Sequence, residues 1–317
     1  MIISLLDISL QQCFLYSIAV YGVVVSFRMM NFPDLTVDGS FTLGGAVLSS
    51  MITSNYPPLI ALPVVAAAGF AAGSATVFLN RKLGISKILS GILIMMVLYS
   101  INLRIMGKAN ISLLRLTTLF SAYDTDDALK VLIFCGISVF FLICLAYLSM
   151  TRLGLFIRAT GDNEFMVQTQ GVNTDWLFYI GIGMANALVA LSGAFVVQNQ
   201  GFADVNMGIG LIITALAALI IGESFTAALV SIKKFIFSKK TIDIFSNTKI
   251  SLLPWSTISE LFSALTGAFL YFLIISICLR LGLAPTDLKL ATGILVILGI
   301  SVRLRGPMVE TYVRGRL

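Results

Sequence analysis

The chain has 317 residues, of which 58% are hydrophobic and 11% charged, and its mean hydropathy is +0.99. A soluble domain carries roughly 25% charged residues, so this composition excludes that class and predicts a membrane protein. The chain has no histidine and no Gly-x-x-x-x-Gly-Lys-[Ser/Thr] loop, and its four cysteines lack paired spacing. We therefore expect no metal site, no cofactor and no ATPase site in this chain, and we do not expect an enzyme.

Long apolar segments dominate the chain, and crossing a bilayer as a helix takes about 20 such residues. They lie near 9–30, 58–80, 88–106, 129–150, 176–198, 207–223, 257–279 and 286–302, with a shorter run near 41–54. Continuous apolar runs argue against a transmembrane barrel, whose strands alternate over about ten residues. We predict an all-α polytopic membrane protein with eight to nine transmembrane helices in a single domain, 1–317.

A polar break at 31–40 interrupts the apolar pattern with one proline and one glycine. A carboxylate at the centre of a span costs about 2.5–3.5 kcal/mol, so Asp34 and Asp38 should face a cavity or a partner. The alternative is that one of them caps a helix starting near Ser40 at the membrane surface. The sequence leaves both interpretations open.

A second passage, 201–210, places Phe, Asp and a small polar residue at the same offsets as 31–40. Paired interruptions in two halves indicate a substrate path in transporters built from structural repeats. Asn102 could instead bond to a neighbouring helix, and Asp204 and Asn206 could lie at the outer surface. The predicted translocation path comprises Asp34, Thr36, Asp38, Gly39, Ser40, Asn102, Asp204 and Asn206.

The most unusual feature is the polar segment 151–175, which separates two apolar runs. An ordinary turn needs only a few residues, whereas this segment has the length for a short helix between Gly161 and Gly171. Asp162, Asn163 and Glu164 would favour the N-terminal dipole of that helix. We predict a docking surface for a soluble partner, with an ordinary turn flanked by membrane-anchoring arginines as the alternative.

The net charge is +6, and most of the basic residues lie in the polar segments that connect the apolar runs. Fourteen basic residues fall near 81–87, 151–175, 224–256 and 303–317, against six in the opposite loops and helix ends, with Arg28 unassigned. The positive-inside rule then places the polar segment in the cytoplasm and gives no reason to expect nucleic acid as a partner. The basic insert at about 224–256 is expected to lie on anionic lipid head groups, with a regulatory or docking role as the alternative.

Four passages together resemble the permease subunits of bacterial ABC importers, in the group of branched-chain amino acid and ribose permeases. Within that group the chain is most similar to uncharacterised or tryptophan/tyrosine-type permeases. The passages are Phe-Pro-Asp-Leu-Thr-Val-Asp-Gly-Ser-Phe at 32–41, Ser-Ile-Asn-Leu-Arg-Ile-Met-Gly at 100–107, Ile-Arg-Ala-Thr-Gly-Asp-Asn-Glu at 157–164 and Gly-Val-Asn at 171–173.

The resemblance implies a cytoplasmic ABC ATPase, an extracytoplasmic solute-binding protein and a second permease copy as partners, in the bacterial inner membrane. It implies a broken helix near the translocation path at 34–39, and a coupling helix that enters a groove on the ATPase. The coupling residues it marks are Arg158, Ala159, Gly161, Asn163 and Gly171, to which we add the adjacent Asp162 and Glu164. The basic insert departs from the family pattern.

The function expected from the sequence is inward transport of a small organic solute by alternating access, coupled to a separate ATPase. An amino acid is the leading cargo, by resemblance alone. The alternative is an ion-coupled secondary transporter that uses the broken helices around Asp34 and Asp38.

Overall fold

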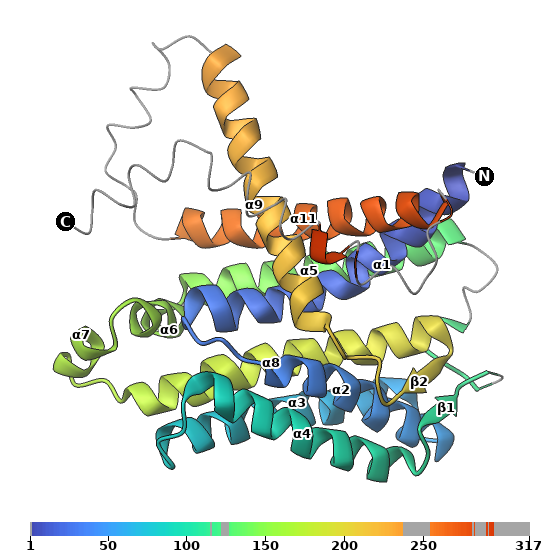
Figure 1. Ribbon diagram of the computed structural model, residues 1–317, viewed down its shortest axis with the longest axis horizontal. Helices are drawn as coiled ribbons and strands as arrows, with labels where there is room; N and C mark the ends of the chain where they lie inside the picture. The colour runs from blue at the N-terminus through green and yellow to red at the C-terminus, as the bar shows by residue number, and fades with distance from the viewer. Residues whose placement is uncertain are drawn as a thin grey trace.

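The computed structural model describes residues 2–114, 116–121, 127–236 and 254–280, together with 282, 290 and 292–294. Figure 1 shows most helices running along one common direction, with one helix, α9, crossing steeply out of the bundle.

Six helices in this part of the chain are long and apolar enough to cross a membrane. They are α1 (Ile2–Val23) continued by the π-helix η1 (Val24–Met29), α3 (Pro58–Arg81), α4 (Lys87–Met106), α5 (Asp127–Met150), α8 (Thr174–Gln200) and α11 (Pro254–Arg280). Two further helices are α2 (Thr36–Thr53) and α9 (Leu211–Ile236), of which Leu211–Thr226 forms a shorter apolar helix. The prediction of an all-α polytopic membrane protein is confirmed, and the run expected at 286–302 lies almost wholly outside the described residues.

Local sequence signals explain where the spans begin and end. Pro58 occupies the first turn of α3, where its missing N–H would have no helical partner in any case. The Ser86 hydroxyl accepts the Leu89 N–H at 3.4 Å at the start of α4. Gly107 (φ 67°) and Gly201 (φ 75°) end α4 and α8 in the left-handed conformation that glycine adopts most easily.

The break expected near 31–40 occupies residues 30–35, and residues 36–40 are helical. Asn31 has a left-handed φ of 46°. The Asp34 carboxylate then accepts the Thr36 N–H at 2.9 Å, so α2 begins about one turn earlier than the expected start near Ser40. The basic insert differs as well: α9 continues the helix to Ile236, and 237–253 lies outside the described residues.

Helix α8 forms the centre of the bundle: 78% of its most apolar stretch is buried, compared with 17% for α5. It packs on α1, α2 and α3. The contact between α2 and α8 needs glycine on both sides: a β-carbon at Gly44 would overlap the Ala190 carbonyl, and one at Gly193 would overlap the Phe41 carbonyl. Small residues let helix backbones approach this closely in membranes.

The two ends of the bundle carry different structures (Figure 1). At one end, β1 (Asn110–Ser112) pairs antiparallel with β2 (Phe202–Asp204). At the other end lie α6 (Arg152–Asp162) and α7 (Glu164–Thr169) of the polar segment. Arg28, left unassigned from the sequence, pairs with Glu223 of α9.

Candidate functional site

A cavity of about 230 Å³ lies between α2, α4 and the passage that leads into α9. Its lining on α4 extends from Met95, about 12 Å along the helix axis from Lys87, to Asn102, about 22 Å along, so the cavity runs from the middle of this span towards the end that carries β1 and β2. The lining residues are Asp38, Gly39, Thr42, Met95, Met96, Tyr99, Asn102, Val205 and Ile209. Three residues of the predicted translocation path, Asp38, Gly39 and Asn102, therefore line one cavity.

Asp38 joins the two broken passages of the chain. Its carboxylate accepts the backbone N–H of Gly210 and that of Ile212, each at 2.9 Å, at the N-terminus of α9. The Thr42 hydroxyl, one turn further along α2, accepts the Gly208 N–H at 3.1 Å. A carboxylate in this position satisfies otherwise unpaired helix N–H groups and interacts favourably with the helix dipole.

This contact combines the two interpretations that the sequence left open for Asp38. The residue caps a helix, but the helix is α9 and not its own α2. Its side chain also lines the cavity at membrane depth instead of lying at the membrane surface. The similar passages at 31–40 and 201–210 are thus brought together by hydrogen bonds across more than 170 residues of sequence.

Asp34, Thr36 and Ser40 are fully buried in a polar network and do not line the cavity. The Asn186 amide on α8 donates to the Asp34 carboxylate at 2.6 Å and accepts from the Ser40 hydroxyl at 2.6 Å. The Thr36 hydroxyl lies 2.6 Å from that of Thr76 on α3. The network joins α2, α3 and α8, and it surrounds the Asp34 carboxylate with hydrogen-bond donors.

Of the other predicted path residues, one lines the cavity and two do not. The Asn102 amide donates to the Gly39 carbonyl at 3.2 Å, the helix–helix bond given as its alternative, while the residue also lines the cavity. Asp204 lies in β2, where its carboxylate accepts the Asn206 N–H at 2.7 Å. Asp204 and Asn206 do not line the cavity, but their neighbour Val205 does.

The polar segment contains the predicted short helix and a second helix before it. Asn163 ends α6 and caps α7, because its side chain accepts the Met166 N–H at 3.1 Å. Gly171, with φ 77°, follows α7 as expected. Ala159, Asp162, Asn163 and Gly171 are exposed, and so are the apolar side chains of Phe165 (74%) and Met166 (58%).

The remaining residues of the coupling set contact the membrane helices. A β-carbon at Gly161 would overlap the Met29 carbonyl, so the end of α6 lies directly against the end of η1. Arg158 pairs with Glu260 of α11 at 3.6 Å. Glu164 pairs with Arg81 in the last turn of α3.

Arg81 connects three elements. It binds Glu164 on α7 and Asp175 on α8, the latter at 2.5 Å, and its guanidinium lies 4.9 Å from the centroid of the Phe178 ring. Burial acts to raise the pKa of the Glu164 carboxyl, but hydrogen bonds from Arg81 and Thr174 and the charges of Arg81 and Lys87 leave that pKa below its usual value.

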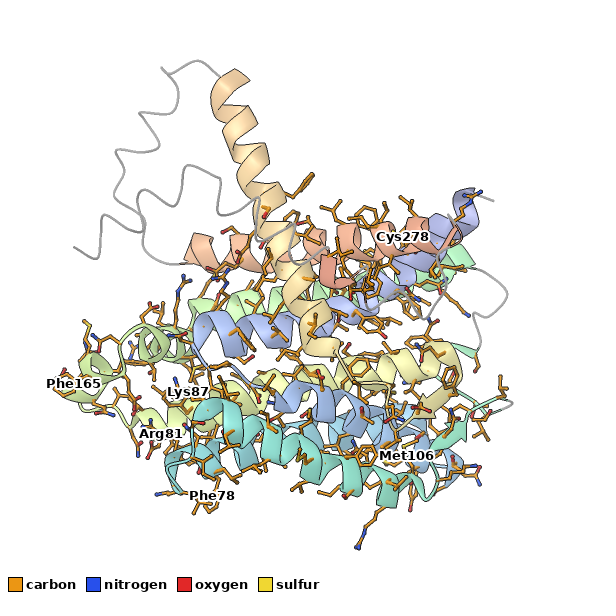
Figure 2. All side chains as sticks on the ribbon, in the orientation of Figure 1. Phe78, Arg81, Lys87, Met106, Phe165 and Cys278 are labelled. Carbon is orange, nitrogen blue, oxygen red and sulfur yellow. The ribbon has the colours of Figure 1, made fainter. Side chains whose placement is uncertain are left out.

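Lys87, the first residue of α4, completes a route from the polar segment to the helix break. Its ammonium donates to the Asn31 carbonyl at 3.1 Å and lies 5.5 Å from the Phe32 ring and 5.6 Å from the Phe178 ring. Cation–π contacts of this kind are worth about 0.5–2 kcal/mol. Figure 2 places Arg81, Lys87 and Phe165 at the same end of the molecule.

Comparison with known proteins identifies the family. The family described as "Branched-chain amino acid transport system / permease component" matches residues 5–275. The chain belongs to this family. It is the permease component of an ABC-type transport system for small solutes and a multi-pass protein of the inner membrane.

Relatives of the permease carry different names. A tyrosine transport system permease protein of Clostridioides difficile is 35% identical over 289 residues, or 90% of this chain and 87% of that protein. An uncharacterised protein of Rickettsia prowazekii is 33% identical, with 94% and 97% covered. The ribose import permease of Escherichia coli is 26% identical, with 69% and 68% covered. No solved structure matches the chain.

Several residues that organise these sites in the permease were not singled out in the sequence. Asn186 is an amide in the middle of an otherwise apolar span, and that isolated polarity was a usable signal. Arg81 and Lys87 were counted only as topology markers. Their ring and carboxylate partners lie on other helices or in the break at 30–35, so sequence spacing gave no signal for these contacts.

Proposed function

We propose that this permease moves an amino acid into the cytoplasm by alternating access, driven by a separate ABC ATPase that docks on the polar segment. The solute would arrive from an extracytoplasmic binding protein at the end that carries β1 and β2. The whole chain, 1–317, would act as one permease domain, with a second copy completing the path. The amino-acid cargo rests on the family and on the tyrosine permease relative.

The observation that carries the proposal is the contact of the polar segment with the helix break. Gly161 lies against Met29, while Arg81 ties α7 to α3 and α8. Lys87 then reaches the Asn31 carbonyl. A displacement of α6 and α7 by an ATPase would therefore act directly on residues 29–31, next to the start of α2.

The exposed residues of the polar segment support the docking role. Phe165 and Met166 on α7 are exposed beside the exposed polar residues Asp162 and Asn163. At the end predicted to face the cytoplasm, lipid would not cover these apolar side chains, and such groups commonly mark protein interfaces. A second copy that completes the path would cover Met96 and Ile209, which line the cavity and are 62% and 61% exposed.

The docking test is site-specific cross-linking in a cysteine-free background. Phe165→Cys should form a cross-link to the co-expressed ATPase, and ATP should change its yield. Leu132→Cys on α5, also well exposed at 69%, is the control and should form none. Equal cross-linking from both positions would contradict docking on α7.

The ion-coupled alternative draws on one observation, the Asp38 carboxylate that lines a cavity at mid-span. Uptake of radiolabelled amino acids into proteoliposomes separates the two mechanisms. If transport is ATP-driven, we expect uptake only in the presence of the ATPase, the binding protein and ATP. Dissipating the ion gradients should then have no effect on uptake. Uptake that persists without the ATPase and collapses with the gradient would overturn it.

A further inference from the structure

The cavity at Asp38 has an unbalanced charge. Among the described residues that line it, Asp38 is the only charged one, and it forms no ion pair with a basic side chain in that part of the chain. The N-terminus of α9 supplies about half a positive charge. That is less than the full negative charge of the carboxylate, so the cavity favours a cation over an anion.

Asp38 retains capacity for another donor. Each of its carboxylate oxygens accepts one backbone N–H from the start of α9. A carboxylate offers about four lone-pair sites, so two remain. The side chain is only partly buried and belongs to the cavity wall, where a solute can approach it.

Asn102 adds a second acceptor to the same wall. The residue is 1% exposed, and its Oδ1 has no hydrogen-bond partner among the residues that the structure describes. The amide orientation is fixed because Nδ2 donates to the Gly39 carbonyl at 3.2 Å. A buried acceptor without a donor is unfavourable, and a donor on a bound solute would relieve that cost after a small movement of the side chain.

We propose that this cavity binds the ammonium group of the transported solute, with Asp38 as its counter-charge and Asn102 Oδ1 as a further acceptor. Met95, Met96 and Tyr99 provide the surface for the apolar part of the solute. No described lining residue is basic, so the solute carboxylate is not recognised here. The inference rests on the proposed function, since it names the chemical group that the path selects.

A neutral solute would fit this arrangement less well. A sugar hydroxyl could donate to Asp38, but it would leave the negative charge uncompensated at membrane depth. Hydrogen bonds between charged groups are roughly twice as strong as neutral ones. Two relatives are named for the transport of tyrosine and of ribose. The cavity favours tyrosine, because tyrosine carries an ammonium group and ribose does not.

The test measures direct binding to the permease–ATPase complex in lipid nanodiscs by equilibrium dialysis. The probes are radiolabelled tyrosine and leucine. Competitors are the corresponding amines, tyramine and isopentylamine, and the acids that lack nitrogen, 3-(4-hydroxyphenyl)propanoate and 4-methylpentanoate. The amines should compete about as well as the amino acids, and the acids and ribose should not. Equal competition by the acids, or no binding of any ammonium compound at millimolar concentration, would overturn the inference.

Two cavity variants test whether Asp38 and Asn102 are the residues that bind the amine. Asp38→Asn keeps an acceptor for α9 but removes the charge, and we expect it to weaken amine binding roughly 10- to 100-fold. Asn102→Leu should weaken it several-fold, and it serves as the second test if Asp38→Asn does not fold. Ser49→Ala is the control, because that buried hydroxyl on α2 donates within its own helix, to the Ala46 carbonyl, and does not line the cavity. Unchanged binding in both cavity variants would overturn the assignment.

Failure of the inference and failure of the proposed function give different results. ATP-driven uptake with amine binding that ignores Asp38 and Asn102 would reject the inference alone. Amine binding that depends on both residues, without any ATP-driven uptake, would reject the proposed function and leave the ammonium site standing.

Discussion

Arg81, in the last turn of α3, forms an ion pair with Glu164, the first residue of α7, and also binds Asp175 of α8 at 2.5 Å. One guanidinium therefore connects α7 of the polar segment to the membrane helices α3 and α8. The stacking of Arg81 and Lys87 near the Phe178 ring extends this connection towards Asn31 in the helix break.

Substituting Arg81 should uncouple ATP hydrolysis from transport. Arg81→Gln removes the charge that holds Glu164 and Asp175, so we expect ATPase activity of the reconstituted complex to persist while uptake falls several-fold. A partly exposed pair is worth about 1 kcal/mol, which is enough to loosen α7 without unfolding the membrane bundle. The measurement is the ratio of solute imported to ATP hydrolysed.

Lys82→Gln provides the matched control for this prediction, because Lys82 is adjacent and basic but forms no ion pair with any described residue. The ratio should stay unchanged in this variant. An exchange of the two charges, Arg81→Glu with Glu164→Arg, should restore part of the coupling if the pair itself transmits the movement. An unaltered ratio in Arg81→Gln would contradict the route through α3.

Enlarging Gly161 should disturb the contact between α6 and η1. In Gly161→Ala the new β-carbon would overlap the Met29 carbonyl, so α6 or η1 must move. Overpacking of this kind costs about 1–3 kcal/mol. We expect a lower Tm in detergent, together with reduced uptake.

The control for Gly161 is Gly136→Ala in α5, where an added β-carbon meets no atom of the described residues within 4 Å. Alanine is favoured over glycine inside a helix by about 1 kcal/mol, so this variant should be neutral or slightly more stable. Equal effects at the two glycines would show that close packing at Met29 is not the cause.

Removing the Asn186 amide should destabilise the bundle. In Asn186→Leu, the buried Asp34 carboxylate loses the donor at 2.6 Å and the Ser40 hydroxyl loses its acceptor. Breaking a buried polar network from one side costs about 2–4 kcal/mol. Thermal unfolding followed by circular dichroism should show a clear drop in Tm, whereas a double variant, Asn186→Leu with Asp34→Leu, should recover part of it.

Acidification should release α7 from the bundle. The Arg81 and Thr174 contacts hold the pKa of Glu164 below its usual value, despite the opposing effect of burial. A depressed pKa gives stability that is complete above the unfolded pKa, about 4.3, and is lost as the pH falls through the folded value. Hydrogen exchange of residues 163–169 should accelerate below about pH 4, after correction for the intrinsic exchange rate.

The Glu164→Gln variant tests the origin of that pH response. Its corrected exchange in 163–169 should already be fast at pH 6 and should change little on acidification. A variant that keeps the wild-type pH response would contradict the assignment of this effect to Glu164.

The sequence alone predicted much of the architecture. Apolar length located the six spans, since crossing the hydrocarbon requires about 20 residues whatever the partners are. Proline, glycine and capping residues predicted the break before α2 and the short helix α7, because these signals act within a few residues. The similarity of 31–40 and 201–210 pointed to a shared role, and the structure places them in contact.

Only the tertiary structure decided which polar residues meet. Asp34 and Asp38 are four residues apart and equally costly in a membrane, yet Asp34 is enclosed by Asn186 and Thr36 while Asp38 caps α9 beside a cavity. The helix period gives the face on which a side chain lies but not the helix that covers that face. The distances from Asp38 to Ile212 and from Arg81 to Asp175 depend on how separate helices pack, and local sequence does not specify that packing.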